Sequence, residues 1–182
     1  MRSLRTGCCL VLVASVAAAA EPAAAAPKSA VESFYAVYMT ERVPGLPSGA
    51  ALEHFRPFMS EHLYKQIIEA LEYQRQWSAR HPDQPSEDGK PPLIFKPPFV
   101  DGDYFTSNFE GAESFKVASE RRMRGDTWKV SIQFTYGSFT WQDAVIVERE
   151  SNRYVVADII FSGAGPFNPA GRLTKFLAAR DE

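Results

Sequence analysis

The spacing of apolar residues changes along this chain, and that change constrains the fold more than any other feature. Near the N-terminus, Val31, Phe34 and Tyr38 recur at the spacing of one helix face. From Trp128 to Tyr136, apolar and polar residues alternate instead, which is the pattern of a strand with one buried face. Helical segments followed by strands predict an α+β domain, with N-terminal helices packed on a curved antiparallel sheet.

Three helices are predicted before the sheet. Ser29 followed by Glu32 fits a capping box, so the first helix should run from Ser29 to about Thr40. A short helix over Ala50–Phe58 should bend at its proline. Ser60 is a good cap for a long amphipathic helix that ends near Arg80, because Pro82 follows.

The second half predicts about four strands and a short C-terminal helix. Gly125 and Asp126 supply a hairpin turn between a strand that starts near Phe115 and the alternating run. The later elements are two strands and a closing helix, over Trp141–Glu148, Tyr154–Phe161 and Leu173–Leu177. Pro82–Pro98 lacks any regular period, and a segment of that length is commonly either a functional loop or disordered.

Residues 1–20 have the layout of a secretory signal peptide. Arg2 and Arg5 open the chain, an apolar run follows, and Ala18–Ala20 supply the small residues that signal peptidase requires. The run is too short for a permanent membrane span, which needs about 20 apolar residues. We therefore expect cleavage near Ala20, a disordered mature N-terminus over residues 21–27, a single domain over 28–182, and a periplasmic or secreted location.

The two cysteines, Cys8 and Cys9, both lie inside this leader, so the mature chain has no thiol for a disulfide, a metal site or a nucleophile. They precede the apolar run, and cleavage before either would remove almost none of the leader, so we expect no lipid anchor. The formal net charge is −2, and no basic face is visible. A nucleic-acid partner is therefore not expected.

Four short segments, spread over nearly the whole mature chain, carry a resemblance. They are Ser33–Tyr38, Phe58–Ser60 with Leu63, Asp101–Thr106, and Asp158–Ile159. In these segments the chain resembles a family of bacterial secreted proteins and lipoproteins related to the nuclear-transport-factor-like, or cystatin-like, fold. The resemblance implies that fold and an envelope location, but no activity. Relatives often carry a lipobox, which this chain lacks.

The most distinctive local feature of the sequence is a pair of aspartates on either side of a glycine, Asp101–Gly102–Asp103. Two carboxylates beside a glycine could direct oxygen ligands at a calcium ion. The full spacing of a calcium loop is absent, however, and Asp also accepts hydrogen bonds from its own following backbone in turns. We expect a turn and no metal site, and Asp101 and Asp103 are candidate binding residues.

Asp158 is the candidate catalytic residue. Alternation places it on one strand face with Tyr154, Val156 and Ile160. If that face lines the concave side of the sheet, burial would raise the pKa of the carboxyl group and suit it to act as a general base. The alternative, which we favour, is a structural carboxylate that faces water or pairs with an arginine.

The aromatic residues also allow two interpretations. Tyr38, Trp128 and Trp141 could line a pocket between sheet and helices, or they could belong to the core. We expect a noncatalytic binding or accessory module of the bacterial envelope, with no cofactor, whose partner is an envelope protein or a small ligand. The alternatives are a small-pocket enzyme with a carboxylate base, and an interaction protein that modulates an envelope enzyme.

Overall fold

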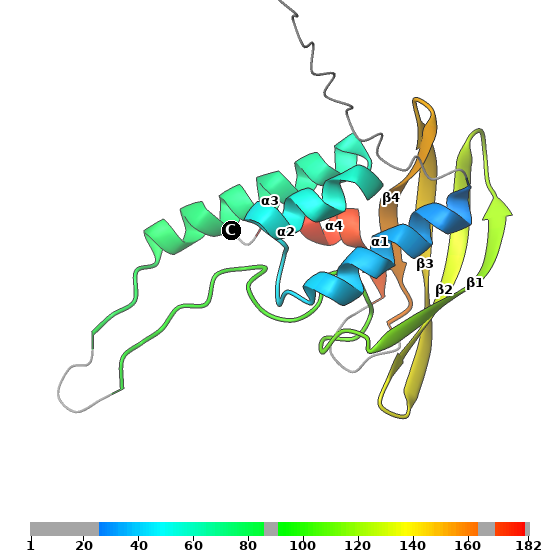
Figure 1. Ribbon diagram of the computed structural model, residues 1–182. Coiled ribbons are helices and arrows are strands. Elements are labelled where there is room, and N and C mark those ends of the chain that lie inside the picture. The colour runs from blue at the N-terminus through cyan, green and yellow to red at the C-terminus, as the bar shows by residue number, and fades with distance from the viewer. Residues whose placement is uncertain (1–25, 86–90, 164–169, 181–182) are drawn as a thin grey trace, which may run out of the picture.

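The first half of the chain folds into helices and the second half into a meander of strands (Figure 1). The structure is a computed structural model that describes residues 26–85, 91–163 and 170–180. The predicted signal peptide, residues 1–20, and residues 21–25 of the predicted disordered terminus lie outside the described residues. The α+β class predicted from apolar spacing is confirmed.

The helices lie close to their predicted positions. They are α1 (Pro27–Glu41), α2 (Gly49–Phe55), a single 3-10 turn η1 (Arg56–Phe58) and α3 (Glu61–Arg80). The capping box predicted for α1 is wrong, because the helix begins at Pro27 after Ala26, which makes no side-chain cap bond. Proline suits that position, since its missing N–H would have no partner in the first turn anyway. The cap predicted for α3 is confirmed: Ser60 Oγ accepts the Leu63 N–H at 3.1 Å.

The sheet has five antiparallel strands in sequence order. They are β1 (Ser114–Arg122), β2 (Thr127–Tyr136), β3 (Phe139–Glu150), β4 (Arg153–Phe161) and β5 (Gly171–Arg172), and α4 (Leu173–Ala178) follows. The four long strands match the prediction. The two-residue β5, which pairs with the end of β4, was missed because no apolar period extends over two residues.

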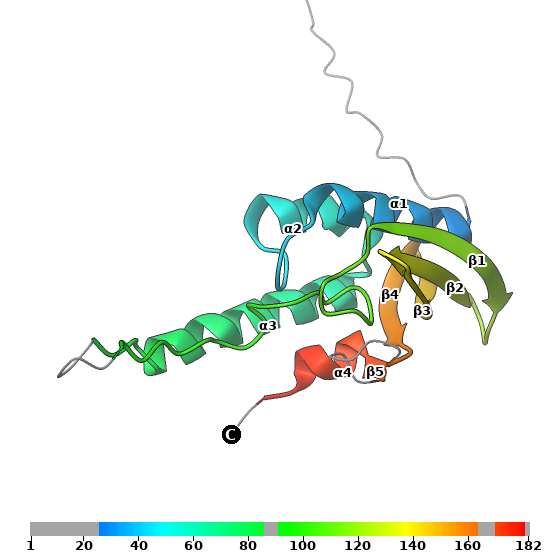
Figure 2. The ribbon, with the colours of Figure 1, turned by 90° about the horizontal axis from the view of Figure 1, so that it is seen from below.

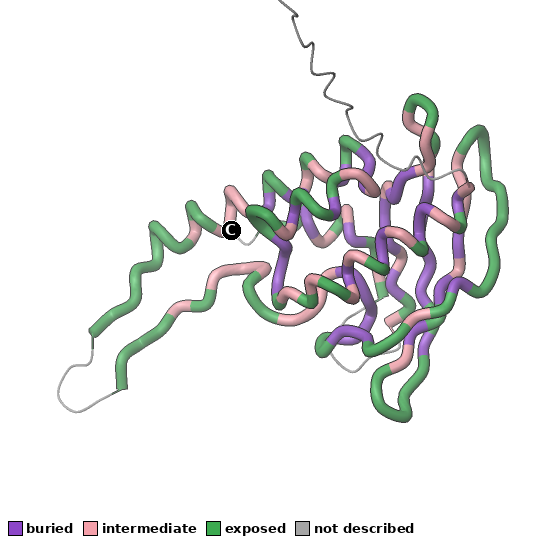
Figure 3. Tube along the Cα trace, in the orientation of Figure 1, coloured by how far each residue is buried: buried purple, intermediate pink, exposed green. Residues whose placement is uncertain are grey.

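One face of the sheet is covered by α1, which contacts all four long strands, and the sheet curves beside this helix (Figure 2). The core between them is rich in aromatic side chains. Tyr35 is fully buried, and its ring centre lies 5.1 Å from that of Phe34 and 5.0 Å from that of Phe134. Figure 3 shows that the buried positions gather where α1 meets the strands.

The N-terminal half of α3 packs on β4 and α4, whereas its C-terminal half extends away from the sheet (Figure 1). Residues 91–98 run back alongside it. An isolated bridge joins Gln84 to Leu93, and Gln74 Nε2 donates to the Pro98 carbonyl at 2.8 Å. The described parts of the predicted Pro82–Pro98 loop, residues 82–85 and 91–98, hold no helix or longer strand; residues 86–90 lie outside the described residues.

Candidate functional site

Residues 99–113 form the irregular connection that leads into β1, and a carboxylate on the sheet holds it in place. Asp143 on β3 is 3% exposed. It accepts the backbone N–H groups of Ser107 at 2.8 Å and Ser162 at 2.9 Å, the Trp141 indole N–H at 3.1 Å, and the Ser107 hydroxyl. Because buried carboxylate oxygens require such donors, Asp143 ties residues 99–113 to the end of the sheet.

A second contact brings the loop after α1 against this connection. The Gly45 N–H donates to the Gly102 carbonyl at 2.7 Å, and the Leu46 N–H donates to the Phe99 carbonyl at 3.1 Å. A Cβ atom on Gly45 would lie 2.5 Å from the Phe99 oxygen. The close approach therefore depends on glycine.

Asp103 occupies the turn that the sequence predicts. Its Oδ1 accepts the backbone N–H groups of Phe105 at 2.8 Å and Thr106 at 2.6 Å. These bonds to the following backbone are those of an Asx turn. They fix the direction of the carboxylate, so that the second oxygen, Oδ2, lies on the side of Gly111 and Tyr38.

Tyr38, near the C-terminal end of α1, meets Asp103. Its hydroxyl accepts the Ala112 N–H at 2.9 Å and is hydrogen-bonded to the Asp103 side chain. Burial, followed by the nearby Asp103 carboxylate, raises the pKa of Tyr38 well above its usual value, so the phenol remains protonated. A Cβ atom on Gly111 would lie 2.6 Å from the Tyr38 hydroxyl oxygen, and glycine is therefore required beside this pair.

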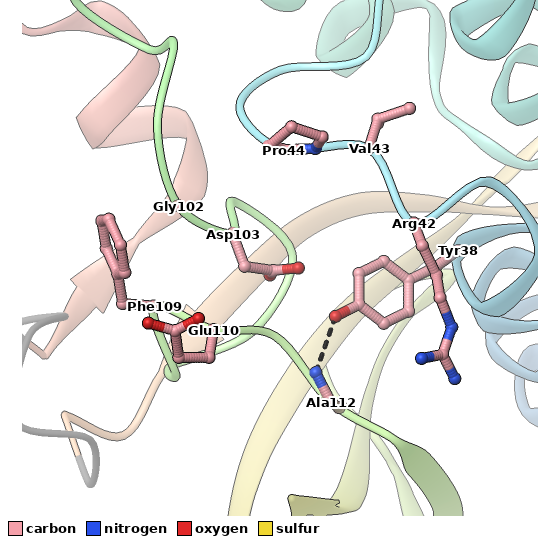
Figure 4. A pocket seen from close by; sticks show the side chains of 9 residues that line it. All are labelled: Tyr38, Arg42, Val43, Pro44, Gly102, Asp103, Phe109, Glu110 and Ala112. Carbon is pink, nitrogen blue, oxygen red and sulfur yellow. Dashed lines mark hydrogen bonds between the residues drawn. The ribbon is translucent and has the colours of Figure 1, made fainter.

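A pocket of about 320 Å³ opens beside these two side chains (Figure 4). Two stretches of chain that are distant in sequence form its walls. They are Tyr38 and Arg42–Pro44 at the end of α1, and Gly102, Asp103, Phe109, Glu110 and Ala112 of the 99–113 connection. Phe109 is 38% exposed, and its ring packs on Gly102, where a Cβ atom would lie 2.5 Å from the ring. The pocket thus combines carboxylates, a phenol and an aromatic ring.

Arg42 is the basic residue of the lining. It ends α1 in the left-handed conformation, with φ of 43°. Its guanidinium donates to the Met39 carbonyl at 3.1 Å and to the Glu113 carbonyl at 3.4 Å. In Figure 4 the guanidinium lies on the far side of the Tyr38 ring from Asp103. These bonds hold the cation at the border of the pocket.

Desolvation governs the ionisation of Asp103. Burial raises the pKa of its carboxyl group from 3.8 to about 6, even though hydrogen bonds from Tyr38, Phe105 and Thr106 oppose the shift. The charged form therefore carries a cost that these donors only partly offset. A carboxyl group whose pKa lies near 6 in a pocket is typical of a functional site, although structural networks produce the same shift.

Of the predicted binding residues, Tyr38 and Asp103 meet in this pocket and the other three lie elsewhere. Asp101 is exposed and pairs with Lys96 at 2.6 Å. Trp141 is buried with its ring stacked on Phe134, 5.4 Å between centres. Trp128, on β2, packs partly buried against the core.

Asp158 is buried and hydrogen-bonded, and its predicted place on one strand face with Val156 is wrong. Ala157 is an extra residue in the β4 register, because Val156 pairs with Val147 while Asp158 pairs with Ile146. This bulge separates Asp158 from Val156, which belongs to the core. Asp158 is 4% exposed and accepts Arg172 Nε at 2.6 Å and the Thr174 N–H and hydroxyl at 3.1 and 3.0 Å. Of the two structural alternatives, exposure to water or pairing with an arginine, the structure shows the arginine pairing.

Sequence reasoning missed Asp143 and Phe109. A signal existed for Asp143, which alternates with Trp141 and Val145 at inward positions of β3; a carboxylate there indicates a buried polar network. Phe109 gave no local signal, since it joins the pocket lining only through the approach of α1.

Comparison with protein-family models, with curated proteins and with solved structures gives no match. Within residues 26–85, 91–163 and 170–180, no helix has both the length and the apolar character needed to cross a membrane. The same residues contain no group of three histidine, cysteine or acidic side chains that could hold a metal ion.

Proposed function

We propose that this chain is an exported protein of the bacterial envelope, of the cystatin-like kind, that acts as a noncatalytic binding module. Its ligand is a small polar molecule held in the pocket beside Tyr38 and Asp103. Export is supported by the composition of residues 1–20, and the cystatin-like assignment by helices packed on a curved antiparallel sheet.

The observation that carries the proposal is the pocket itself. Asp143 and Gly45 hold both of its walls through buried or close backbone contacts, so the cavity is formed without a ligand. Its volume of about 320 Å³ is at the lower end of the range of small-molecule sites, roughly 300–1,000 Å³. An apolar lining with a few convergent polar groups is the usual composition of such sites.

A fragment screen by NMR on the chain from Glu21 to Glu182 tests the proposal. We expect bound fragments to shift the amide signals of Gly111 and Ala112. The blocking variant is Gly111→Ala, whose added methyl group would displace the Tyr38 hydroxyl. The matched control is Gly125→Ala, because Gly125 also has positive φ, +65° against +78°, but nothing lies within 4 Å of its added Cβ.

Both variants carry similar backbone strain, so what separates them is the displacement of the Tyr38 hydroxyl and the Asp103 carboxylate at the pocket. Fragment binding should disappear in Gly111→Ala and persist in Gly125→Ala. The proposal fails if no fragment shifts these amides, or if the two variants bind alike.

The raised pKa of Asp103 favours a second candidate function, an enzyme with a carboxylate base, now placed at Asp103 instead of Asp158. An Asp103→Asn variant separates the two functions. If a bound fragment is converted by the wild-type chain and remains intact with the variant, the protein is an enzyme.

A further inference from the structure

The charge arrangement in the pocket narrows the class of ligand, an inference that rests on the binding function proposed above. Asp103 lies at the pocket wall and Glu110 is exposed in the same lining. The basic lining residue, Arg42, is held by two backbone carbonyls on the far side of Tyr38 in Figure 4. Two carboxylates thus face the cavity while the guanidinium is directed elsewhere.

The direction of Asp103 adds a geometric argument. Its Oδ1 is occupied by two backbone N–H groups of its own turn. Its Oδ2 lies on the side of the Tyr38 hydroxyl, which is hydrogen-bonded to the Asp103 side chain and accepts the Ala112 N–H. A carboxylate fixed in this way is a preformed counter-ion, since a cation binding beside it loses little side-chain freedom.

The aromatic ring in the pocket lining also favours a positively charged ligand. Phe109 presents a ring that is 38% exposed, packed on Gly102 at the pocket. A ring face attracts a cation electrostatically, and more strongly when the cation is desolvated. A neutral alcohol or a carboxylate would gain nothing comparable from this ring.

We infer that the pocket binds a small organic cation with a primary ammonium group, with Asp103 as its main counter-ion, Glu110 as a second carboxylate and Phe109 as an aromatic contact. The volume of about 320 Å³ limits the ligand to a small amine. The cost of ionising Asp103 in the pocket supports this class, because a bound cation offsets that cost directly.

Binding should then depend on pH in a defined direction. The titratable groups around Asp103 are Tyr35 and Tyr38 from α1 and Glu110 from its own connection, while the Arg42 guanidinium lies on the far side of Tyr38. Burial holds both phenols protonated, so Asp103 is the group that titrates near pH 6. An alkylamine stays protonated across this range. Its affinity should therefore fall about tenfold from pH 7.5 to pH 5, as Asp103 takes up a proton.

Three probes of matched size test the inference: n-butylamine, n-butanol and butyrate. Each is titrated into the chain from Glu21 to Glu182 while the Gly111 and Ala112 amide signals are followed. We expect n-butylamine to bind at least about tenfold more tightly than the other two. Asp103→Asn should remove most of that preference and its pH dependence, and the exposed Glu110→Gln should reduce the affinity by a smaller factor.

Asp101→Asn is the matched control, because it removes the same charge from the same connection outside the pocket lining. It should leave n-butylamine binding unchanged. If Asp103→Asn fails to fold, the pH profile of the wild type and the Glu110→Gln variant still decide the question.

The outcomes separate the inference from the binding function. If n-butanol or butyrate shifts these amides as strongly as n-butylamine, or if amine affinity is the same at pH 5 and pH 7.5, the amine inference is overturned and the binding function stands. If neither the three probes nor the fragment screen shifts the amides, both are overturned.

Discussion

Asp103, Asp143 and Asp158 show how surroundings set the role of one residue type. Asp143 accepts three N–H groups and a hydroxyl, and so joins an irregular segment to the sheet. Asp158 accepts hydrogen bonds from the Arg172 guanidinium and from the Thr174 N–H in the first turn of α4. Asp103 lines a pocket, and its pKa is raised. The hydrogen bonds of Asp143 and Asp158 stabilise the fold. Burial instead makes ionisation of Asp103 unfavourable, and a cationic ligand would offset that cost.

Replacing Asp158 tests its structural role. In Asp158→Asn an amide N–H₂ takes the place of one oxygen, and the charge-assisted bond to Arg172 is lost. We expect the free energy of unfolding to fall by about 1–3 kcal/mol, measured by urea denaturation. Asp101→Asn is the control, since its exposed pair with Lys96 should contribute at most about 1 kcal/mol. An Asp158→Asn chain of wild-type stability that has lost an activity would restore the catalytic interpretation.

The raised pKa of Asp103 predicts how stability changes with pH. Its folded-state pKa of about 6 lies above the ordinary 3.8, so the native state binds the proton more tightly than the unfolded state does. This contribution to stability is fully present below about pH 4 and is lost as the pH rises through 6. Asp103→Asn has no such titration. Relative to wild type, the variant should therefore gain roughly 2 kcal/mol between pH 4 and pH 7.5.

Urea unfolding of both chains across this range measures the difference. Other groups titrate in both chains, so only the gap between the two curves is informative. Parallel curves would show that the Asp103 carboxyl group has an ordinary pKa in the folded protein.

Among the secondary-structure elements, helix caps offer a matched comparison. Ser60 caps α3 through its hydroxyl, whereas Ser48 occupies the same position before α2 without a side-chain cap bond. Ser60→Ala should lower the free energy of unfolding by about 1 kcal/mol, because the Leu63 N–H loses its acceptor. Ser48→Ala should change it far less. Equal losses in chemical denaturation would contradict the assignment of the Ser60 cap.

Long periodic segments were the predictable part of the fold. The alternation from Trp128 to Tyr136 identifies β2 because each second residue must enter the core, and Val130, Ile132 and Phe134 do so. The bulge at Ala157 was not predictable, since no residue around it marks an extra position. That one residue moved Asp158 to the other face of β4, and the predicted grouping of Asp158 with Val156 failed with it.

For the whole molecule, the candidate site depends on contacts that span the chain. Tyr38 and Asp103 were predicted separately as binding residues, and the sequence alone could not show that they meet. Their contact requires α1 to lie across the sheet, Asp143 to anchor residues 99–113, and Gly45 to admit the Phe99 carbonyl. None of these conditions produces a local pattern, because each joins residues more than 30 positions apart.

For the whole protein, the composition of residues 1–20 predicts export with cleavage of a leader. Cleavage after Ala20 should release a chain that begins at Glu21, because Ala18 and Ala20 present small side chains to signal peptidase. Mass spectrometry of the protein from intact bacterial cells measures the mature N-terminus. Ala20→Arg should leave the leader attached, since a large charged side chain does not fit the cleavage site.

The control for that experiment is a double change of Cys8→Ser and Cys9→Ser. Both cysteines precede the apolar run, so they should be removed with the leader and their replacement should leave the mature mass unchanged. A mature chain that begins at Cys8 or Cys9 and carries added acyl mass, lost in the serine variant, would instead establish a lipid anchor. The protein would then be anchored at a membrane surface.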